Sequence, residues 1–235
     1  MKIGIIGAMD VEVSLLKERM ETKAVSSFAG REFCEGTIGQ VPVVIVQSGV
    51  GKVNAAICTQ LLIDQFAVTH ILNTGVAGSL NNDINIGDIV ISKEARHHDV
   101  DAQVFGYAPG EVPQLGIAAF PADESLRKKA LEACRAAAPE IGVFEGTVLS
   151  GDQFISRREQ KERIIEVFGG DCAEMEGAAI AQAAWINQVP FVIIRAISDK
   201  ADESVQVSYE EFEGKAAVHC AKLVMSMLES LRSDL

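Results

Sequence analysis

The chain has 235 residues, a mass of 25.2 kDa and a hydrophobic content of 48%, which is enough to form a large folded core. Its formal net charge of −12 excludes nucleic acid and anionic membrane as the main partner, because both require a basic surface. Its five cysteines lack the C-x-x-C spacing of a redox or zinc motif, and no apolar run is long enough to span a bilayer. We therefore expect a cytoplasmic globular protein with reduced cysteines.

The hydrophobic pattern alternates between strands and helices along the whole chain. The first half predicts, in order, a strand over 2–7, a helix over 11–20, a hairpin of strands 26–38 and 41–47, a helix over 53–65, and strands over 69–73, 84–92 and 95–100. The second half predicts a long loop over 101–121, a helix over 125–138, a strand over 142–150, helices over 158–168 and 175–186, a strand over 191–198, and a helix over 209–230. This order predicts one α/β domain over residues 1–235 with a mixed sheet.

Three glycine-containing segments follow predicted strands. The segment GIIG (4–7) lacks the G-x-G-x-x-G pattern of dinucleotide-binding proteins. The segment GVGK (49–52) resembles the end of a P-loop, but Val46 replaces its first glycine and Val53 its Ser or Thr. NAD binding and ATP hydrolysis are therefore unsupported. The third segment, GVAG (75–78), is predicted to be a loop whose small residues let a ligand approach the backbone.

Carboxylates border two apolar segments in the second half of the chain. Glu174 and Glu176 precede the small apolar run 177–184 and are predicted at or just inside a helix N-terminus. Asp199 ends the apolar strand predicted over 191–198. Carboxyl groups at the edge of an apolar core acquire raised pKa values and can perform acid–base chemistry near neutral pH. Helix and strand caps are the competing interpretation, and these segments alone leave both open.

The histidines do not indicate a metal site. His97 and His98 are adjacent on a predicted strand and therefore point to opposite faces, so one ion cannot easily bind both. His70 and His219 stand alone and favour structural roles. We expect no metal and no cofactor.

Six short segments together carry a family resemblance. They are, in chain order, MKIGIIGAM (1–9) with Glu12, SGVGKVNAA (48–56), NTGVAG (73–78), SGDQFI (150–155), EME (174–176) and RAISD (195–199). The set resembles the 5′-methylthioadenosine/S-adenosylhomocysteine nucleosidases of the purine nucleoside phosphorylase superfamily. The resemblance covers nearly the whole chain, and its specificity comes from the set, since each segment alone is a weak signal.

The resemblance implies a nucleoside phosphorylase-like fold: a mixed, partly barrelled central sheet surrounded by helices. It also implies a homodimer that hydrolyses the N-glycosidic bond of methylthioadenosine and S-adenosylhomocysteine. The same activity would extend to 5′-deoxyadenosine. The products would be adenine and a 5-thioribose compound. The reaction would serve methionine salvage and the recycling of S-adenosylmethionine by-products, with no cofactor.

Carried over residue by residue, the resemblance implies a division of labour in the site. Asp199 would be the general acid that protonates adenine N7, and Glu12 the base that activates water at the anomeric carbon. Glu176 would bind the ribose hydroxyls, Met175 would pack against the sugar, and Arg195 would help to order the water. Adenine leaves readily only when protonated, so an acid with a raised pKa is chemically required.

The remaining positions would shape the rest of the substrate pocket. Phe154 would stack on adenine and the Ile155 backbone would read its edge. The other residues expected to bind substrate are Met9, Val50, Ala77, Gly78, Phe105, Ser198 and Tyr209. Phe105 lies with Pro113 in the predicted loop over 101–121, which is expected to reach the pocket of the neighbouring subunit.

Two departures from the family pattern concern the pocket. Val76 stands where many members have a Ser that helps to hold the attacking water, and Ala102 is smaller than the usual valine. Three alternatives remain: a nucleoside phosphorylase, a futalosine-type nucleosidase with a larger 5′ group, and a nucleoside-binding protein without activity. Phosphate would meet repulsion from Glu12, and a binding protein would need no acid–base pair.

Overall fold

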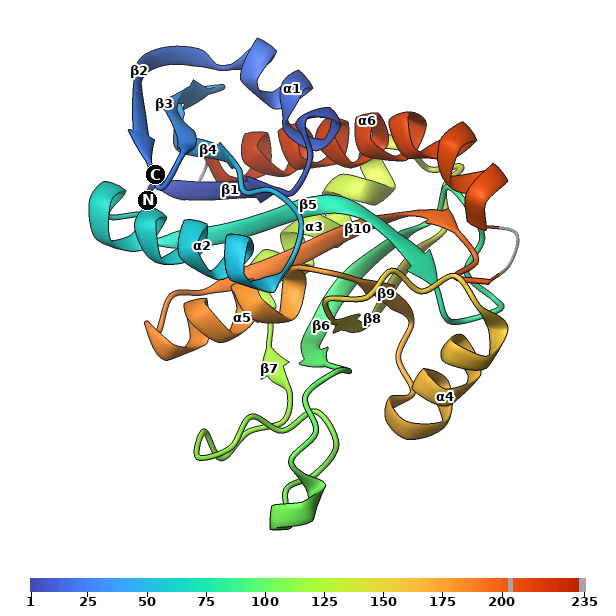
Figure 1. Cartoon of the computed structure of the whole chain (residues 1–235). Coiled ribbons are helices and arrows are strands. Elements are labelled where there is room, and N and C mark those ends of the chain that lie inside the picture. The colour runs from blue at the N-terminus through green and yellow to red at the C-terminus, as the bar shows by residue number, and fades with distance from the viewer. Residues whose placement is uncertain (203–204, 233–235) are drawn as a thin grey trace.

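The described part of the chain, residues 1–202 and 205–232 of a computed structural model, folds into a mixed β-sheet with helices packed against it (Figure 1). The strands, in chain order, are β1 (Ile3–Gly7), β2 (Glu21–Phe28), β3 (Arg31–Ile38), β4 (Val41–Gln47), β5 (His70–Ser79), β6 (Ile89–His97), β7 (Phe120–Pro121), β8 (Val143–Ser150), β9 (Cys172–Glu174) and β10 (Phe191–Asp199). The helices are α1 (Asp10–Arg19), α2 (Lys52–Phe66), the single turn η1 (Gln103–Phe105), α3 (Glu124–Ala137), α4 (Arg158–Phe168), α5 (Gly177–Ile186) and α6 (Val205–Leu231).

Part of the sheet closes into a barrel. β10 pairs parallel with β5 and antiparallel with β6, β6 pairs parallel with β8, β8 pairs parallel with β9, and β9 returns antiparallel to β5. From β5 the sheet continues outward through β1 and β4 to β3 and β2. The α/β class with a mixed, partly barrelled sheet is confirmed.

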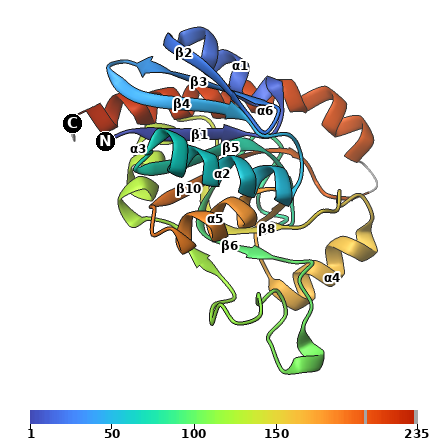
Figure 2. The same cartoon turned by 60° about the vertical axis from the view of Figure 1, so that its left-hand side comes forward.

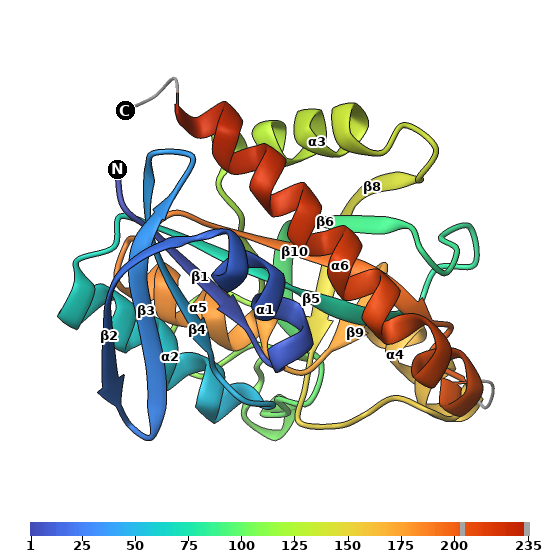
Figure 3. The ribbon, with the colours of Figure 1, turned by 90° about the horizontal axis from the view of Figure 1, so that it is seen from above.

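Helices cover the sheet in two groups, each over its own apolar cluster. α1, α3 and α6 share one cluster, and in Figure 3 α6 crosses the sheet with α1 and α3 on either side of it. α2 and α5 share the other cluster and lie together on the opposite side of the sheet in Figure 1. The central strands β1 and β10 are buried along their whole length, which explains the apolar sequence of β1 and of the first four residues of β10.

Residues 98–119, between β6 and β7, form an extension that we call the arm. In Figures 1 and 2 it projects away from the body of the molecule, with η1 at its far end. The sequence prediction of one long loop is wrong in detail, because η1 and β7 interrupt the segment. Within the described residues, no helix is long and apolar enough to cross a bilayer.

Two strand predictions in the first half of the chain are wrong. The strand predicted over 26–38 is the hairpin of β2 and β3, which turns at Ala29 and Gly30 with φ values of 50° and 71°. Alanine is uncommon in such left-handed turns, which conceals the turn in the sequence. The strands predicted over 84–92 and 95–100 are the single strand β6, with an irregular register between Ser92 and Glu94.

Two predictions around the candidate site also need correction. The segment 75–78, predicted as a loop, is the last part of β5. The predicted helix over 175–186 begins at Gly177, with Glu176 as its N-cap residue. Glu174 lies outside that helix, because it ends the unpredicted strand β9, which pairs with both β5 and β8.

Candidate active site

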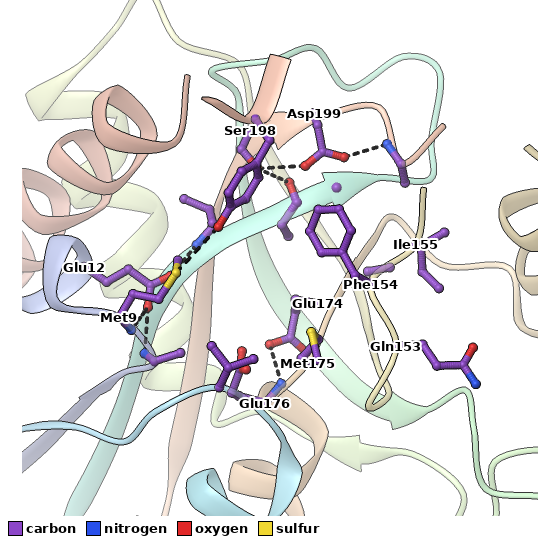
Figure 4. A pocket seen from close by; sticks show the side chains of 18 residues that line it. Met9, Glu12, Gln153, Phe154, Ile155, Glu174, Met175, Glu176, Ser198 and Asp199 are labelled. Atoms are coloured by element: carbon purple, nitrogen blue, oxygen red, sulfur yellow. Dashed lines mark hydrogen bonds between the residues drawn. The ribbon is translucent and has the colours of Figure 1, made fainter. Parts of the chain in front are cut away.

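A cavity opens where β1, β5, β9 and β10 end, so that residues far apart in the sequence meet there (Figure 4). Carboxyl ends of strands are the usual ligand sites of open α/β sheets. The cavity is lined by Ala8, Met9, Glu12, Val50, Val76, Ala77, Gly78, Gln153, Phe154, Ile155, Ala173, Glu174, Met175, Glu176, Ser198, Asp199, Ala201 and Tyr209. Both predicted catalytic carboxylates and most of the predicted binding residues therefore lie in one cavity.

Glu12 lies in the first turn of α1, and backbone N–H groups hold both of its carboxylate oxygens. Oε2 accepts hydrogen bonds from the N–H groups of Ala8 at 2.6 Å and Met9 at 3.0 Å. Oε1 accepts a bond of 3.0 Å from the N–H of Val76 on β5. Burial raises the pKa of Glu12, whereas Arg195 and the three N–H groups oppose that rise. Glu12 is thus both a helix-capping residue and an acidic group facing the cavity.

Asp199 ends β10 on another side of the cavity (Figure 4). Its Oδ1 accepts a hydrogen bond of 2.7 Å from the N–H of Ala201, and its Oδ2 accepts one of 2.9 Å from the Ser198 hydroxyl. The carboxyl group is buried, and this burial raises its pKa. The direction is the one that a general acid at neutral pH requires.

Glu176 is the third buried carboxylate of the cavity. Its Oε1 accepts a hydrogen bond of 2.8 Å from the Gly51 N–H, and its Oε2 lies 3.8 Å from Nη2 of Arg195. Burial raises the pKa of Glu176, and the nearby Glu174 adds to this rise. The loop before α2, which contains Val50, is thereby tied to the N-terminus of α5.

Arg195 supports the carboxylates without itself lining the cavity. Its Nη2 pairs with Glu174 and donates a 2.6 Å hydrogen bond to Oδ1 of Asn73. A Cβ at Gly75 would overlap both the Arg195 guanidinium and the Glu12 carboxylate. Glycine at this position on β5 is therefore what allows the two side chains to approach each other.

An apolar wall faces these carboxylates. The Phe154 ring lies edge-on to Tyr209, with centroids 5.6 Å apart, and points into the cavity in Figure 4. The Tyr209 hydroxyl donates to the Met9 sulfur at 3.5 Å. Met175 lines the cavity beside Glu176. The site therefore offers aromatic and thioether surface on one side and carboxylates on the other.

Besides Arg195, which lies behind the carboxylates, two more sequence predictions fall outside this cavity. Phe105 is 79% exposed in η1, at the far end of the arm, and Pro113 lies in the same arm. Their predicted contact with a neighbouring subunit stays a prediction. Among residues 1–202 and 205–232, no cluster of three or more His, Cys, Asp and Glu side chains could hold a metal ion.

The sequence reasoning missed several supporting residues. The sequence places Glu174 only near a helix start, because its pairing with Arg195 depends on β9, which no sequence pattern predicts. The Ser150 hydroxyl donates to Glu174 and accepts a 2.7 Å hydrogen bond from the Ala178 N–H. Asn73 and Ser150 both lie inside family motifs, and this was the only signal available for them.

Comparison with known proteins places this geometry in a family. Residues 2–229 match the family model of the Phosphorylase superfamily. The 5′-methylthioadenosine/S-adenosylhomocysteine nucleosidase of Shewanella pealeana is 45% identical over 232 residues, covering 98% of this chain and 100% of that protein. The crystal structure of a nucleosidase of the same name from Neisseria meningitidis, in complex with methylthio-immucillin-A, matches with a TM-score of 0.95 and 42% identity, covering 98% of this chain and 99% of the other.

A second kind of enzyme shares the fold. Futalosine hydrolase of Helicobacter pylori matches with a TM-score of 0.92 and 34% identity, and 98% of each chain is covered. The barrel, the buried carboxylates at its strand ends and the match over residues 2–229 define an enzyme of the phosphorylase superfamily. Within it, the chain belongs to the 5′-methylthioadenosine/S-adenosylhomocysteine nucleosidase family, whose members are named for hydrolysis of a nucleoside.

Proposed function

We propose that the protein hydrolyses the N-glycosidic bond of 5′-methylthioadenosine and S-adenosylhomocysteine, releasing adenine and the corresponding 5-thioribose. The observation that carries this proposal is the presence of Glu12 and Asp199, two buried carboxyl groups with raised pKa values, in one cavity. The close relatives bear the names of these two substrates.

Asp199 acts as the general acid. Adenine is a poor leaving group until it is protonated, so the acid must still hold its proton near neutral pH. Burial supplies the raised pKa, and the bond from Ala201 fixes one carboxyl oxygen. The other carboxyl oxygen, bonded to Ser198, delivers the proton to adenine N7 while Phe154 stacks on the base.

Glu12 acts as the base on the sugar side. Cleavage passes through an oxocarbenium-like sugar, whose positive charge is stabilised by nearby carboxylates. The backbone N–H groups and Arg195 favour the ionised form of Glu12, which can then accept a proton from the attacking water. Glu176 binds the ribose hydroxyls, and Arg195 keeps the carboxylates in place from behind.

Water is the nucleophile in this proposal, and phosphate is not. The described residues that line the cavity include four carboxylates and no lysine or arginine. A phosphate dianion would enter a field of like charge without a cation to receive it. The cavity therefore favours a nucleosidase over a phosphorylase.

The 5′ substituent is accommodated by the apolar wall. Met9, Val50 and Tyr209 provide a surface that suits an alkylthio group, and its loss in 5′-deoxyadenosine would remove contacts without blocking the reaction. We assign the reaction to methionine salvage and the recycling of S-adenosylmethionine by-products in the cytoplasm. The fold similarity to futalosine hydrolase makes a futalosine-type nucleoside the second candidate substrate, and competition with methylthioadenosine separates the two.

The protein acts as a homodimer in this proposal. Apolar side chains are exposed on α2, α5 and the arm, among them Val53 at 69%, Ile186 at 52% and Phe105 at 79%. Residues of α2, α5 and the arm together line a shallow groove on this face. A second copy would cover the groove and bring Phe105 and Pro113 to the neighbouring cavity. Phe105→Ala should therefore raise KM for methylthioadenosine in a protein whose mass by light scattering stays dimeric, whereas a fully active monomer would refute this part.

The direct test of the reaction is product analysis in phosphate-free buffer. We expect adenine and free methylthioribose from methylthioadenosine, at a rate that added phosphate does not increase. Release that requires phosphate and yields a sugar phosphate would make the protein a phosphorylase. Binding of the nucleoside without release of any purine would leave only a binding function.

A further inference from the structure

Lys161 is a buried charged residue with no part in the mechanism described so far. It lies on α4 and is only 8% exposed. Its Nζ donates a 2.7 Å hydrogen bond to the carbonyl oxygen of Lys200, immediately after Asp199. Burying an ammonium group is unfavourable unless its donors and its charge find partners. The partners of Lys161 lie in the loop that follows the candidate acid.

One peptide group connects Lys161 to Asp199. The Lys200 carbonyl that accepts from Lys161 belongs to the same planar unit as the Ala201 N–H. That N–H donates the 2.7 Å hydrogen bond to Oδ1 of Asp199. An ammonium at the oxygen end polarises the peptide group and strengthens the hydrogen bond at its N–H end.

The same peptide group leads into a strained turn. Ala201 has a φ of 53°, in the left-handed region that is unfavourable for alanine. Nζ of Lys200 donates a 2.6 Å hydrogen bond to the Ile84 carbonyl, which fixes the turn from a second side. A Cβ at Gly78 would stand 2.7 Å from Oδ1 of Asp199 and 2.9 Å from the Cβ of Ala201, so β5 packs closely against the turn.

The charges that face Lys161 come from two elements. Asp199 is the last residue of β10, Lys200 and Asp202 lie in the loop after it, and Arg158 belongs to α4 itself. Desolvation lowers the pKa of Lys161, while Asp202 and Asp199 favour its charged form.

The Lys161 charge and burial shift the pKa of Asp199 in opposite directions. Burial raises the pKa of Asp199, and the Ala201 N–H, the Ser198 hydroxyl and the Lys161 charge lower it, while Asp202 raises it further. Removing the Lys161 charge would therefore let the pKa of Asp199 rise.

We propose that Lys161 is a positioning residue that orients Asp199 through the peptide group between Lys200 and Ala201. The inference rests on the proposed role of Asp199 as general acid. α4 follows the segment of Phe154 and Ile155, so Lys161 also ties the adenine side of the cavity to the acid. With the Lys161 ammonium in place, the Ala201 N–H is bonded to one carboxyl oxygen of Asp199, and the other oxygen is left to face adenine.

The test compares Lys161→Met with Arg163→Met, which removes one positive charge from an exposed position on the same helix. For Lys161→Met we expect kcat to fall roughly tenfold, with KM for methylthioadenosine changed by less than about threefold. The alkaline limb of the kcat profile should move up by about half a pH unit, because the acid keeps its proton longer. Arg163→Met should keep the wild-type kcat, and its alkaline limb should lie at the wild-type pH.

A double-mutant cycle separates positioning from a general structural effect. In an Asp199→Asn background, Lys161→Met should reduce the residual rate by less than about twofold, since the group it orients is already lost. An equal loss in both backgrounds, or an unshifted alkaline limb in folded Lys161→Met, would overturn the proposal. If Lys161→Met does not fold, Lys161→Gln, which keeps a donor without the charge, must show the same limb shift. Failure of the wild type to release adenine would instead refute the proposed function.

Discussion

Glu12 and Asp199 face the same cavity, but the chain holds them in different ways. Glu12 lies in the first turn of α1, and three backbone N–H groups occupy both of its oxygens. Asp199 lies at the end of β10, with one backbone N–H and one hydroxyl as partners. Burial raises the pKa of both, and only Glu12 has a buried arginine among the groups that oppose the rise.

This difference explains how two buried carboxyl groups can take opposite roles. Hydrogen bonds from N–H groups and a nearby cation favour the ionised form of a carboxyl group. Glu12 has more of this support and suits a base, whereas Asp199 has less and suits an acid. The proposed roles follow from the groups around each carboxyl, because the side chains themselves have similar chemistry.

The largest expected effect comes from Glu12→Gln. Loss of the base should lower kcat/KM for methylthioadenosine by about 10²–10⁴-fold. The glutamine side chain also replaces one accepting oxygen by an NH₂ group, which cannot accept the hydrogen bonds that backbone N–H groups donate to Glu12. The free energy of unfolding should therefore fall by about 1–3 kcal/mol. Adenine release and chemical denaturation measure the two effects.

The matched control is Glu18→Gln, at an exposed position on the same helix. It should leave both the rate and the stability unchanged. If Glu12→Gln kept the wild-type rate, Glu12 would be a capping residue and nothing more.

The pH dependence of stability should differ between wild type and Asp199→Asn. The folded state binds the Asp199 proton more tightly than the unfolded chain, where the carboxyl titrates near 3.8. The stabilisation is therefore complete below that pH and is lost as the pH rises through the folded-state pKa. Asp199→Asn lacks this loss, so the thermal midpoint of the variant should rise relative to that of the wild type as the pH increases above about 4. A difference between the two midpoints that stays constant with pH would contradict the raised pKa.

The smallest effect is expected from Val76→Ser, which introduces the hydroxyl that the family resemblance leads us to expect at this position. The Val76 N–H already bonds Glu12, and the substitution leaves that bond in place. We expect the rate to change by less than about fivefold, because a single water contact contributes little beside the base itself. Val76→Ala removes similar apolar area without adding a hydroxyl and serves as the control. A much larger gain with serine alone would show that the water site depends on the hydroxyl.

The residues that line the cavity could be predicted from the sequence more completely than the residues that position them through hydrogen bonds and ion pairs. Glu12, Glu176 and Asp199 could be placed together because the family motifs fix their order along the chain. The barrel could be expected from the same resemblance. Local pattern alone also indicated that β10 is buried, since its first four residues are all apolar.

What could not be predicted depends on contacts across the fold. The role of Glu174 required β9, a strand of three residues that gives no periodic signal. The turn at Ala29 depends on an alanine in the left-handed backbone conformation. The burial of Lys161 depends on α4 packing beside the end of β10. Such features follow from tertiary packing, which overrides local preference.

The most direct test of the division between acid and base is the pH profile of adenine release by Asp199→Asn beside the wild type. We predict a wild-type profile whose alkaline limb reports Asp199, and a variant that is slower by about 10²–10⁴-fold and lacks that limb. An acidic limb from Glu12 should remain in both proteins. A variant that keeps the wild-type rate, or an alkaline limb at the same pH, would contradict the assignment of Asp199 as the general acid.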